Sequence, residues 1–183
     1  MRVNIDANGN INGTLVLPLW QDSKEMVEGS EIGVHRTLKN QIDTVLEAGD
    51  FKAKSGSSMT LAGTEGGKAL LIGLGKMDDA SSNSMREAGA KVTASLSKIH
   101  GKTLTVRFHG LEDAQMANFV EGMILRDYSY DHYKSKDEEN EEDDEELSVH
   151  ITCEEEKAAV LSSAAKHASE VASGVYLARD LGN

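Results

Sequence analysis

One short stretch, residues 68–74 (KALLIGL), constrains the fold more than any other part of the chain. All six residues after its lysine are apolar or glycine, so a strand built from them is apolar on both faces. Side chains of a strand point alternately to opposite faces, and a strand that is apolar on both faces is buried on both. This is typical of a central strand in a sheet with helices packed on each side. The chain is therefore predicted to form a layered α/β domain.

Strand-like and helix-like patterns alternate along the rest of the chain. Two local signals add detail: residues 63–67 should form a hairpin-like turn, and Ser84 with Glu87 should form the capping box of the second helix. The alternation favours a largely parallel or mixed sheet. Strands are predicted at residues 2–6 (an edge strand), 14–20, 58–62, 68–74, 103–108 and 147–152, and helices at residues 31–47, 84–99, 112–126 and 154–181.

The negative charge of the chain is concentrated in one place. Residues 137–146 hold nine carboxylates, interrupted only by Asn140, and the net charge of −12 becomes −3 once those nine are set aside. Such a run cannot bury apolar surface, so it is predicted to be a mobile loop. The overall charge repels phosphates, which predicts that neither nucleic acid nor an anionic membrane surface is a partner.

The cysteine content and the N-terminal residues predict a cytoplasmic protein. Cys153 is the only cysteine, so no disulfide can form within the chain, as fits a reducing compartment. The first ten residues (MRVNIDANGN) are polar and lack the apolar core of a signal peptide. No apolar run approaches the ~20 residues that a membrane-spanning helix needs.

Two glycine-rich segments match phosphate-binding loops only in part. Residues 63–69 (GTEGGKA) lack the first glycine of the nucleotide-binding pattern, where Ala62 stands, and the hydroxyl after its lysine, where Ala69 stands. Residues 73–75 (GLG) follow a strand, as the dinucleotide fingerprint requires, but Asp78 occupies the position of its third glycine. Neither segment predicts a nucleotide site.

No cluster of chemically active side chains is visible in the sequence. No two histidines stand four residues apart and none pairs with Cys153, so no zinc site is predicted. The acidic run lacks the spacing of a calcium loop, and no Gly-x-Ser-x-Gly elbow is present. The sequence therefore predicts no catalytic, cofactor-binding or metal-ligating residue. The histidines are His35, His100, His109, His132, His150 and His167.

Residues 128–134 (YSYDHYK) hold three of the four tyrosines. We interpret them as a helix end whose rings pack on the core with their hydroxyls at the surface. A site at which the rings stack on a nucleic-acid base or an adenine is the alternative. The acidic run beside them favours packing.

Five segments, in order, resemble the N-terminal domain of the leucine aminopeptidase (cytosol aminopeptidase) family. The resemblance extends from residue 49 to the last residue, whereas the first 48 residues match only in pattern. Departures include Tyr130, where the family usually has phenylalanine, and Gly182, where an aliphatic residue is usual. The segments are residues 49–54 (GDFKAK, family GDFKGK), 68–76 (KALLIGLGK, family vllvGLGK), 85–90 (MREAGA, family lRraga), 121–122 (EG) with 128–134 (family EG…Y.FdrYK), and 172–183 (ASGVYLARDLGN, family a.gv.laRDLvN).

The resemblance implies a three-layer α/β/α domain similar to macro domains, with a mixed sheet and a long C-terminal connecting helix. In the family the chemistry lies in a following catalytic domain, where two divalent metals, usually zinc (manganese is the other candidate), activate the water that attacks the N-terminal peptide bond. The family's ligand regions, TKGxGM and NTDAEGRL, do not occur here, so no metal ligand is carried over. The parent enzymes are typically hexamers with this domain at the periphery.

Three hypotheses follow for the chain. In the first it is the non-catalytic domain of a metallo-aminopeptidase, with residues 1–153 as a macro-like unit and residues 154–183 as a helix leading to an absent catalytic domain. In the second it is a stand-alone module of macro-domain type that binds ADP-ribose, with residues 73–75 as its candidate loop. The third is an unrelated α/β interaction domain. The closing Arg179-Asp180-Leu181-Gly182-Asn183 favours the first, because that motif has no role in a free module.

The last helix carries two adjacent apolar stripes, one through Leu161, Ala168 and Val175 and one through Val160 and Val171. At about 28 residues it would be ~42 Å long, more than one face of this sheet needs. Its N-terminal part is predicted to pack on this domain, and the part from about residue 169 onward is predicted to meet the catalytic domain.

Overall fold

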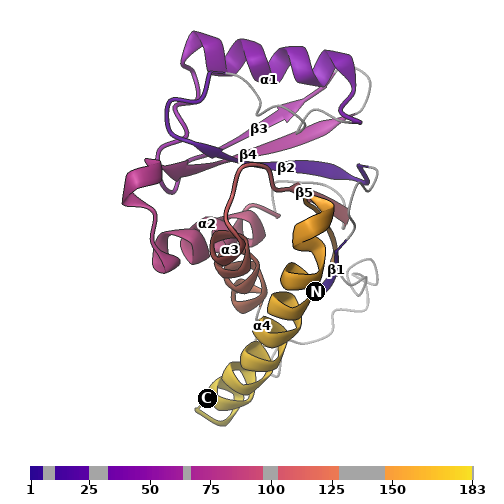
Figure 1. Ribbon diagram of the computed structural model, residues 1–183, viewed down its shortest axis with the longest axis vertical. Coiled ribbons are helices and arrows are strands. Elements are labelled where there is room, and N and C mark those ends of the chain that lie inside the picture. Colours follow the sequence, from indigo (N-terminus) through magenta and orange to yellow (C-terminus); the bar gives the residue numbers. More distant parts are fainter. Residues whose placement is uncertain (6–10, 25–32, 64–66, 97–102, 128–146, 183) are drawn as a thin grey trace, which may run out of the picture.

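The structure, a computed structural model, describes residues 1–5, 11–24, 33–63, 67–96, 103–127 and 147–182. Strands and helices alternate through most of the chain (Figure 1). In chain order the elements are β1 (Arg2–Ile5), β2 (Thr14–Trp20), α1 (Arg36–Ala48), β3 (Ser58–Ala62), β4 (Lys68–Gly75), the 3-10 turn η1 (Met77–Asp79), α2 (Ser82–Ala94), β5 (Thr103–Arg107), α3 (Asp113–Arg126), β6 (Ser148–Thr152) and α4 (Glu155–Gly182).

The strands form one mixed sheet in the order β1-β6-β5-β2-β4-β3. Every neighbouring pair is parallel except β3 and β4, which form the hairpin predicted from residues 63–67. A hydrogen bond from the Gly63 N–H to the Gly67 carbonyl closes that hairpin at 2.6 Å. β1 lies at one edge of the sheet, and β4 is buried on both faces, as their residue patterns predicted.

The helices cover both faces of the sheet, which confirms the three-layer arrangement. α1 packs on one face through Leu38, Ile42 and Leu46, whereas α2, α3 and α4 pack on the other, and each side has its own apolar core. Figure 1 shows α1 above the sheet and α2 and α3 below it. The likeness to macro domains stays a prediction.

Two helices begin more than one residue away from the predicted position. α1 begins at Arg36, because Gly33 takes a left-handed conformation (φ 75°) and the ring nitrogen of His35 caps the helix by accepting from the Thr37 N–H. α2 begins at Ser82, with Ser81 and Ser84 forming the capping box. Ser84 is therefore its third residue and not its cap. The predicted partner, Glu87, instead accepts a bond from the Asn83 amide (2.7 Å).

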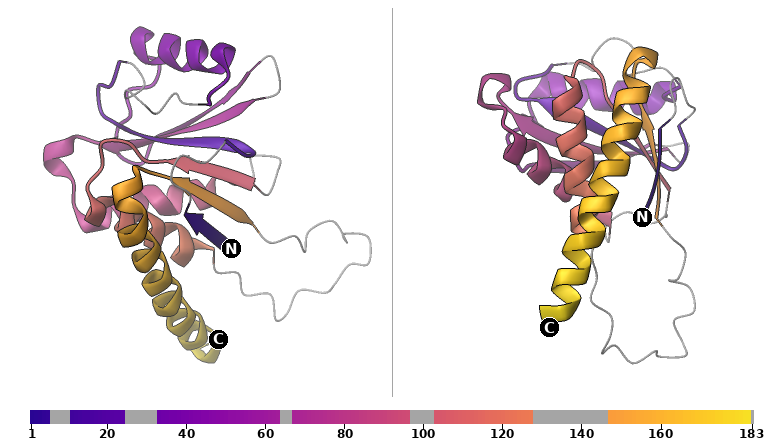
Figure 2. Two further views of the ribbon diagram at one scale, coloured as in Figure 1. Left: turned by 45° about the vertical axis from the view of Figure 1, so that its right-hand side comes forward. Right: turned by 60° about the horizontal axis from the view of Figure 1, so that its bottom comes forward.

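The long C-terminal helix is confirmed as one element, and it extends beyond the rest of the domain. Figure 2 shows the C-terminal end of α4 standing clear of the sheet layers. Its buried residues, Leu161, Ala165, Ala168 and Ala172, belong to the predicted inner stripe. Contact with α3 continues as far as Tyr176, whose hydroxyl donates to the Ile124 carbonyl oxygen. Packing on this domain thus continues nearly two turns beyond the predicted point.

Candidate functional site

The carboxyl ends of β5 and β6 bring a small group of titratable side chains together. His109 follows β5, Cys153 and Glu154 follow β6, and Lys157 lies in the first turn of α4. Ligand sites of parallel sheets are usually found at this edge. The group is therefore the first candidate for a chemical site in the chain.

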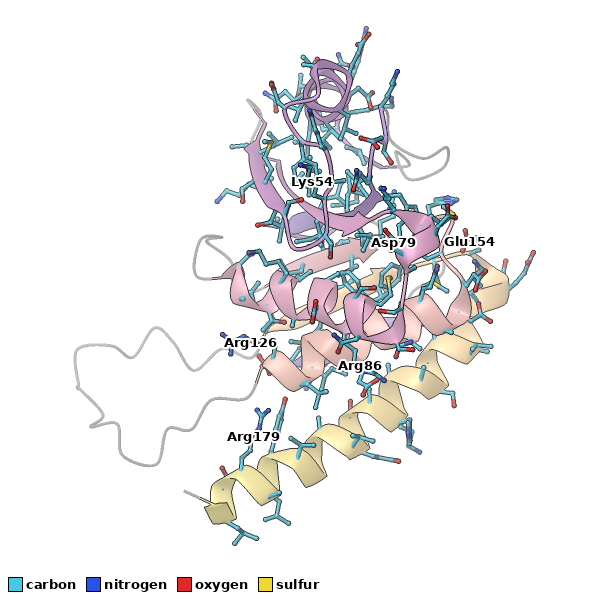
Figure 3. The ribbon with its side chains drawn as sticks, turned by 90° about the vertical axis from the view of Figure 1, so that its left-hand side faces the viewer. Lys54, Asp79, Arg86, Arg126, Glu154 and Arg179 are labelled. Carbon is cyan, nitrogen blue, oxygen red and sulfur yellow. The ribbon has the colours of Figure 1, made fainter. Side chains whose placement is uncertain are left out.

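Glu154 is the centre of this group. One carboxylate oxygen lies 3.2 Å from the His109 Nδ1 and the other lies 3.5 Å from the Lys157 Nζ. The Lys157 ammonium also donates to the Leu111 carbonyl oxygen at 2.6 Å. In Figure 3, Glu154 lies at the start of α4, at the opposite end of the helix from Arg179. The group therefore fastens the start of α4 to the segment between β5 and α3.

The electrostatics of the group favour a structural role. Burial would raise the pKa of Glu154, but its own backbone N–H, Lys157 and His109 together lower that pKa below the ordinary value of 4.5. Burial, and then the Glu154 carboxylate, raise the pKa of the Cys153 thiol. A thiol with a raised pKa stays protonated near neutral pH and is a poor nucleophile. The group therefore stabilises the position of α4 and contains no activated nucleophile.

The histidines singled out in the sequence are placed on separate elements. His35 caps α1, His109 contacts Glu154, His150 lies on β6 beside the Ser148 hydroxyl, and His167 is exposed on α4. Within the described ranges, no three His, Cys, Asp or Glu side chains are grouped so as to hold a metal ion. His100, His132, the tyrosine-rich residues 128–134 and the acidic residues 137–146 lie outside the described residues.

The glycines at residues 73–75 are explained by close packing of the backbone. The Gly73 N–H donates to the Ser57 carbonyl (2.9 Å) and the Gly75 N–H to the Ala53 carbonyl (3.0 Å). A Cβ on Gly73 would collide with the Lys54 carbonyl oxygen and the Ser57 hydroxyl. Phosphate-binding loops offer free backbone N–H groups to their ligand, and here both groups are already used. These residues do not form an anion-binding loop.

Most of the exposed large apolar side chains among the described residues lie on α4. Of the five large apolar side chains that are exposed among the described residues, four belong to this helix: Val160, Val171, Leu177 and Leu181. We call the following set the outer stripe, because its members recur at steps of four and three and so share one face of the helix. The outer stripe consists of Val160, Ala164, His167, Val171, Gly174, Ala178 and Leu181.

Sequence reasoning found part of this arrangement. Three apolar members of the outer stripe, Val160, Ala164 and Val171, were predicted from helical spacing as a stripe beside the buried one, whereas Ala178 and Leu181 were not. The contacts of Glu154 were missed. Their only local signal is Lys157 three residues later, at helical spacing, and His109 is distant in sequence.

No described helix is both long enough and apolar enough to cross a membrane.

Comparison with known proteins gives a consistent result. The sequence model of the cytosol aminopeptidase family, N-terminal domain, matches residues 16–137. A probable cytosol aminopeptidase of Protochlamydia amoebophila is 32% identical over 176 residues, which cover 92% of this chain and 34% of that protein. The chain thus spans about a third of the length of such relatives.

Two solved structures share the fold. A tomato leucine aminopeptidase variant superposes with a TM-score of 0.68 at 20% identity, over 99% of this chain and 38% of the other. The bottromycin maturation enzyme BotP, solved in complex with Mn, gives a TM-score of 0.62 at 19% identity, over 93% of this chain and 31% of the other. At these identities the likeness establishes the fold alone.

Proposed function

Because the chain belongs to the cytosol aminopeptidase family, as its N-terminal domain, we propose that it is the non-catalytic part of a dimetal leucine aminopeptidase. The parent enzyme removes N-terminal amino acids from peptides. The catalytic domain lies in the part of the protein that this chain does not contain. The chain alone is inactive and serves scaffolding or assembly.

The observation that carries this proposal is the exposed outer stripe of α4. A helix face with Val171 at 39% and Leu181 at 81% exposure is costly to leave in water, and such surfaces usually meet another protein surface. We assign residues 1–153 to a macro-like unit and residues 154–183 to the connecting helix. The outer stripe then packs against the catalytic domain, while the inner stripe packs on this domain.

The metal chemistry is proposed for the catalytic domain. Two divalent ions, zinc or manganese, would polarise the peptide carbonyl and activate water there. Among the described residues, no group of three or more His, Cys, Asp or Glu side chains could hold a metal ion by itself. The manganese bound to BotP supports the class of metal only by analogy.

The setting of the enzyme is also part of the proposal. The parent protein is expected in the cytoplasm, as a hexamer, without a nucleic-acid or membrane partner. The net charge of −12 supports the absence of nucleic acid, because phosphate repulsion must be overcome before any local contact forms.

Two measurements test the assignment. Leucine p-nitroanilide is incubated with the purified chain and either zinc or manganese. No hydrolysis above buffer is expected, and activity that copurifies with the chain would refute the proposal. The gene is also read beyond the codon of Asn183, where a downstream sequence lacking the two family metal-ligand motifs would refute it equally.

The ADP-ribose alternative has its own measurement. Calorimetric titration with ADP-ribose is expected to give no binding, because the Gly73 and Gly75 N–H groups are already hydrogen-bonded. Saturable binding with one site per chain would favour the stand-alone module.

A further inference from the structure

β3 is an edge strand with one side open. It pairs with β4, and within the described part of the chain no strand pairs with its other side. The hydrogen bonds at the two ends of the hairpin, Gly63 N–H to Gly67 and Gly73 N–H to Ser57, fix which residues bond to β4. Bonded and non-bonded pairs alternate in an antiparallel ladder. The backbone N–H and C=O groups of Met59 and Leu61 therefore form their hydrogen bonds with β4.

The backbone groups of Ser58, Thr60 and Ala62 consequently point outward, to the open side. Edge strands in natural proteins are usually protected by lysine, proline, a bulge or an inward-pointing charge. Residues 57–63 (SSMTLAG) contain no charged residue and no proline, and the register with β4 is regular from Ser58 to Ala62. The opposite edge of the sheet differs, since β1 carries the exposed Arg2. β3 thus has the features of an edge that another strand covers.

A groove lies beside this edge, between β3 and α1. It has a volume of about 400 Å³, and no charged side chain lines it, in a chain with 31 acidic residues. The Gln41 Oε1 in its wall is buried and accepts no hydrogen bond from the described residues. Buried polar atoms are normally paired, so the groove has the character of an incomplete interface. Its lining residues are Asn40, Gln41, Thr44, Val45, Leu61 and Ala62.

We propose that β3 is a homotypic interface, at which two copies of this chain pair antiparallel about a two-fold axis through Thr60. With the axis at Thr60, the two copies of β3 overlap along their whole length. The outward-pointing backbone N–H and C=O groups of each copy then hydrogen-bond to those of the other. It sets Thr60 opposite Thr60, Met59 opposite Leu61 and Ser58 opposite Ala62. Every cross-strand pair is thus uncharged, and the apolar side chains meet on the α1 side.

The groove explains why the second copy is the favoured occupant. Met59 and Leu61 lie on the α1 face of β3, where both are partly buried. In the two-fold arrangement, Met59 of each copy faces the Leu61 end of the other's groove, and a methionine side chain adapts well to such irregular space. Two chains of net charge −12 repel each other, so a surface that is free of acid is favoured for their association. The edge of β3 and its groove provide one.

The first test is the association state of the chain. Because a five-residue edge is a small interface, a weak dimer is expected, visible by sedimentation equilibrium at about 100 µM. Thr60→Pro removes one outward N–H without touching the bonds to β4, so it should weaken association roughly tenfold or more. Thr60→Val keeps the N–H and is the matched control. A parent chain that stays monomeric, or an equally strong Thr60→Pro dimer, would overturn the proposal.

The second test measures which residues of the two β3 strands lie opposite each other. It does not require β3 to fold with a proline in it. Paired residues of a bonded antiparallel pair have Cα atoms about 5.5 Å apart, within disulfide range. The only native cysteine, Cys153, is buried. Thr60→Cys should therefore form a disulfide dimer on mild oxidation. Ser58→Cys should do so only when mixed with Ala62→Cys. Equal cross-linking of Ser58→Cys alone would overturn the register.

A third variant separates this interface from α4. Val171→Glu places a charge on the outer stripe and leaves β3 untouched. The dimer should survive it, and a dimer lost with Val171→Glu but kept with Thr60→Pro would overturn the proposal. None of these outcomes bears on the aminopeptidase assignment, which is tested by activity and by the downstream sequence.

Discussion

The crossing of α2 and α3 offers the sharpest test of the packing. A Cβ on Gly89 of α2 would collide with the Phe119 carbonyl oxygen of α3, and a Cβ on Gly122 of α3 would collide with the Arg86 carbonyl oxygen of α2. The two backbones therefore meet directly, flanked by the Arg86–Glu121 ion pair (2.9 Å). Replacing Gly89 by alanine forces two helices apart in the middle of a core.

The size of the effect follows from two opposing terms. Alanine in place of a helical glycine normally stabilises by about 0.5–1 kcal/mol. Overpacking a core typically costs about 1–3 kcal/mol, and more when rigid backbone must move. For Gly89→Ala we expect a net loss of about 2 kcal/mol, or roughly 4–8 °C in melting temperature for a domain of this size.

Thermal and urea unfolding of Gly89→Ala measure this loss, and α4 supplies the control. Gly174 is also helical, but apart from the adjoining backbone of its own helix no atom lies within 4 Å of where its Cβ would be. Gly174→Ala should raise stability by about 0.5–1 kcal/mol, because only the backbone entropy changes. If Gly89→Ala melts at or above the parent temperature, the helices do not cross at their glycines and the reasoning fails.

Three further predictions concern α4 and the acidic run. Tyr176→Phe removes the hydroxyl that donates to the Ile124 carbonyl, so it should cost about 1 kcal/mol and speed hydrogen exchange in the last turns of α4; unchanged exchange would contradict this anchor. Glu154 has a lowered folded pKa, so its carboxylate stabilises the fold above the unfolded pKa, and that contribution is lost as the pH falls through the folded value. Glu154→Gln should therefore melt lower than the parent at pH 7 and equally at a pH below the folded value; a gap that persists in acid would contradict the ion-pair role. Deleting residues 137–146 removes nine carboxylates and with them self-repulsion, so the melting temperature at low salt should hold or rise; a fall of many degrees would mean that the run pairs with basic groups.

Local pattern in the sequence was enough to predict most of the secondary structure. The apolar run at residues 68–74 marks β4, and the spacing of Leu161, Ala165, Ala168 and Ala172 marks the inner face of α4. These signals are strong because burial repeats with the period of the element. The cap of α2 was placed three residues too late, because Ser81 and Ser84 are both good caps and only the backbone conformation selects between them.

Features that depend on distant contacts could not be predicted. The resemblance included Gly89 and Gly122, but only the structure shows that each meets the backbone of the other helix where α2 and α3 cross. Residues 73–75 are similarly ambiguous, because a glycine needed for backbone packing looks the same in sequence as one needed for a phosphate. The contact of His109 with Glu154 joins residues 45 positions apart, and no local pattern encodes such a pair.

The way α4 is fastened has a mechanical consequence. In addition to the packing of its inner stripe, the 28-residue helix is held at its start by Glu154 and about six turns later by the Tyr176 hydroxyl. At ~1.5 Å per residue it is ~42 Å long, and a tilt of about 5° at its base would carry its far end roughly 4 Å. A small movement of the sheet at the start of α4 would therefore displace its C-terminal end by a larger distance. The hydrogen bond of the Tyr176 hydroxyl limits that displacement. The orientation of anything joined to the end of α4 would thus depend on the packed inner stripe and on two polar contacts more than 20 residues apart.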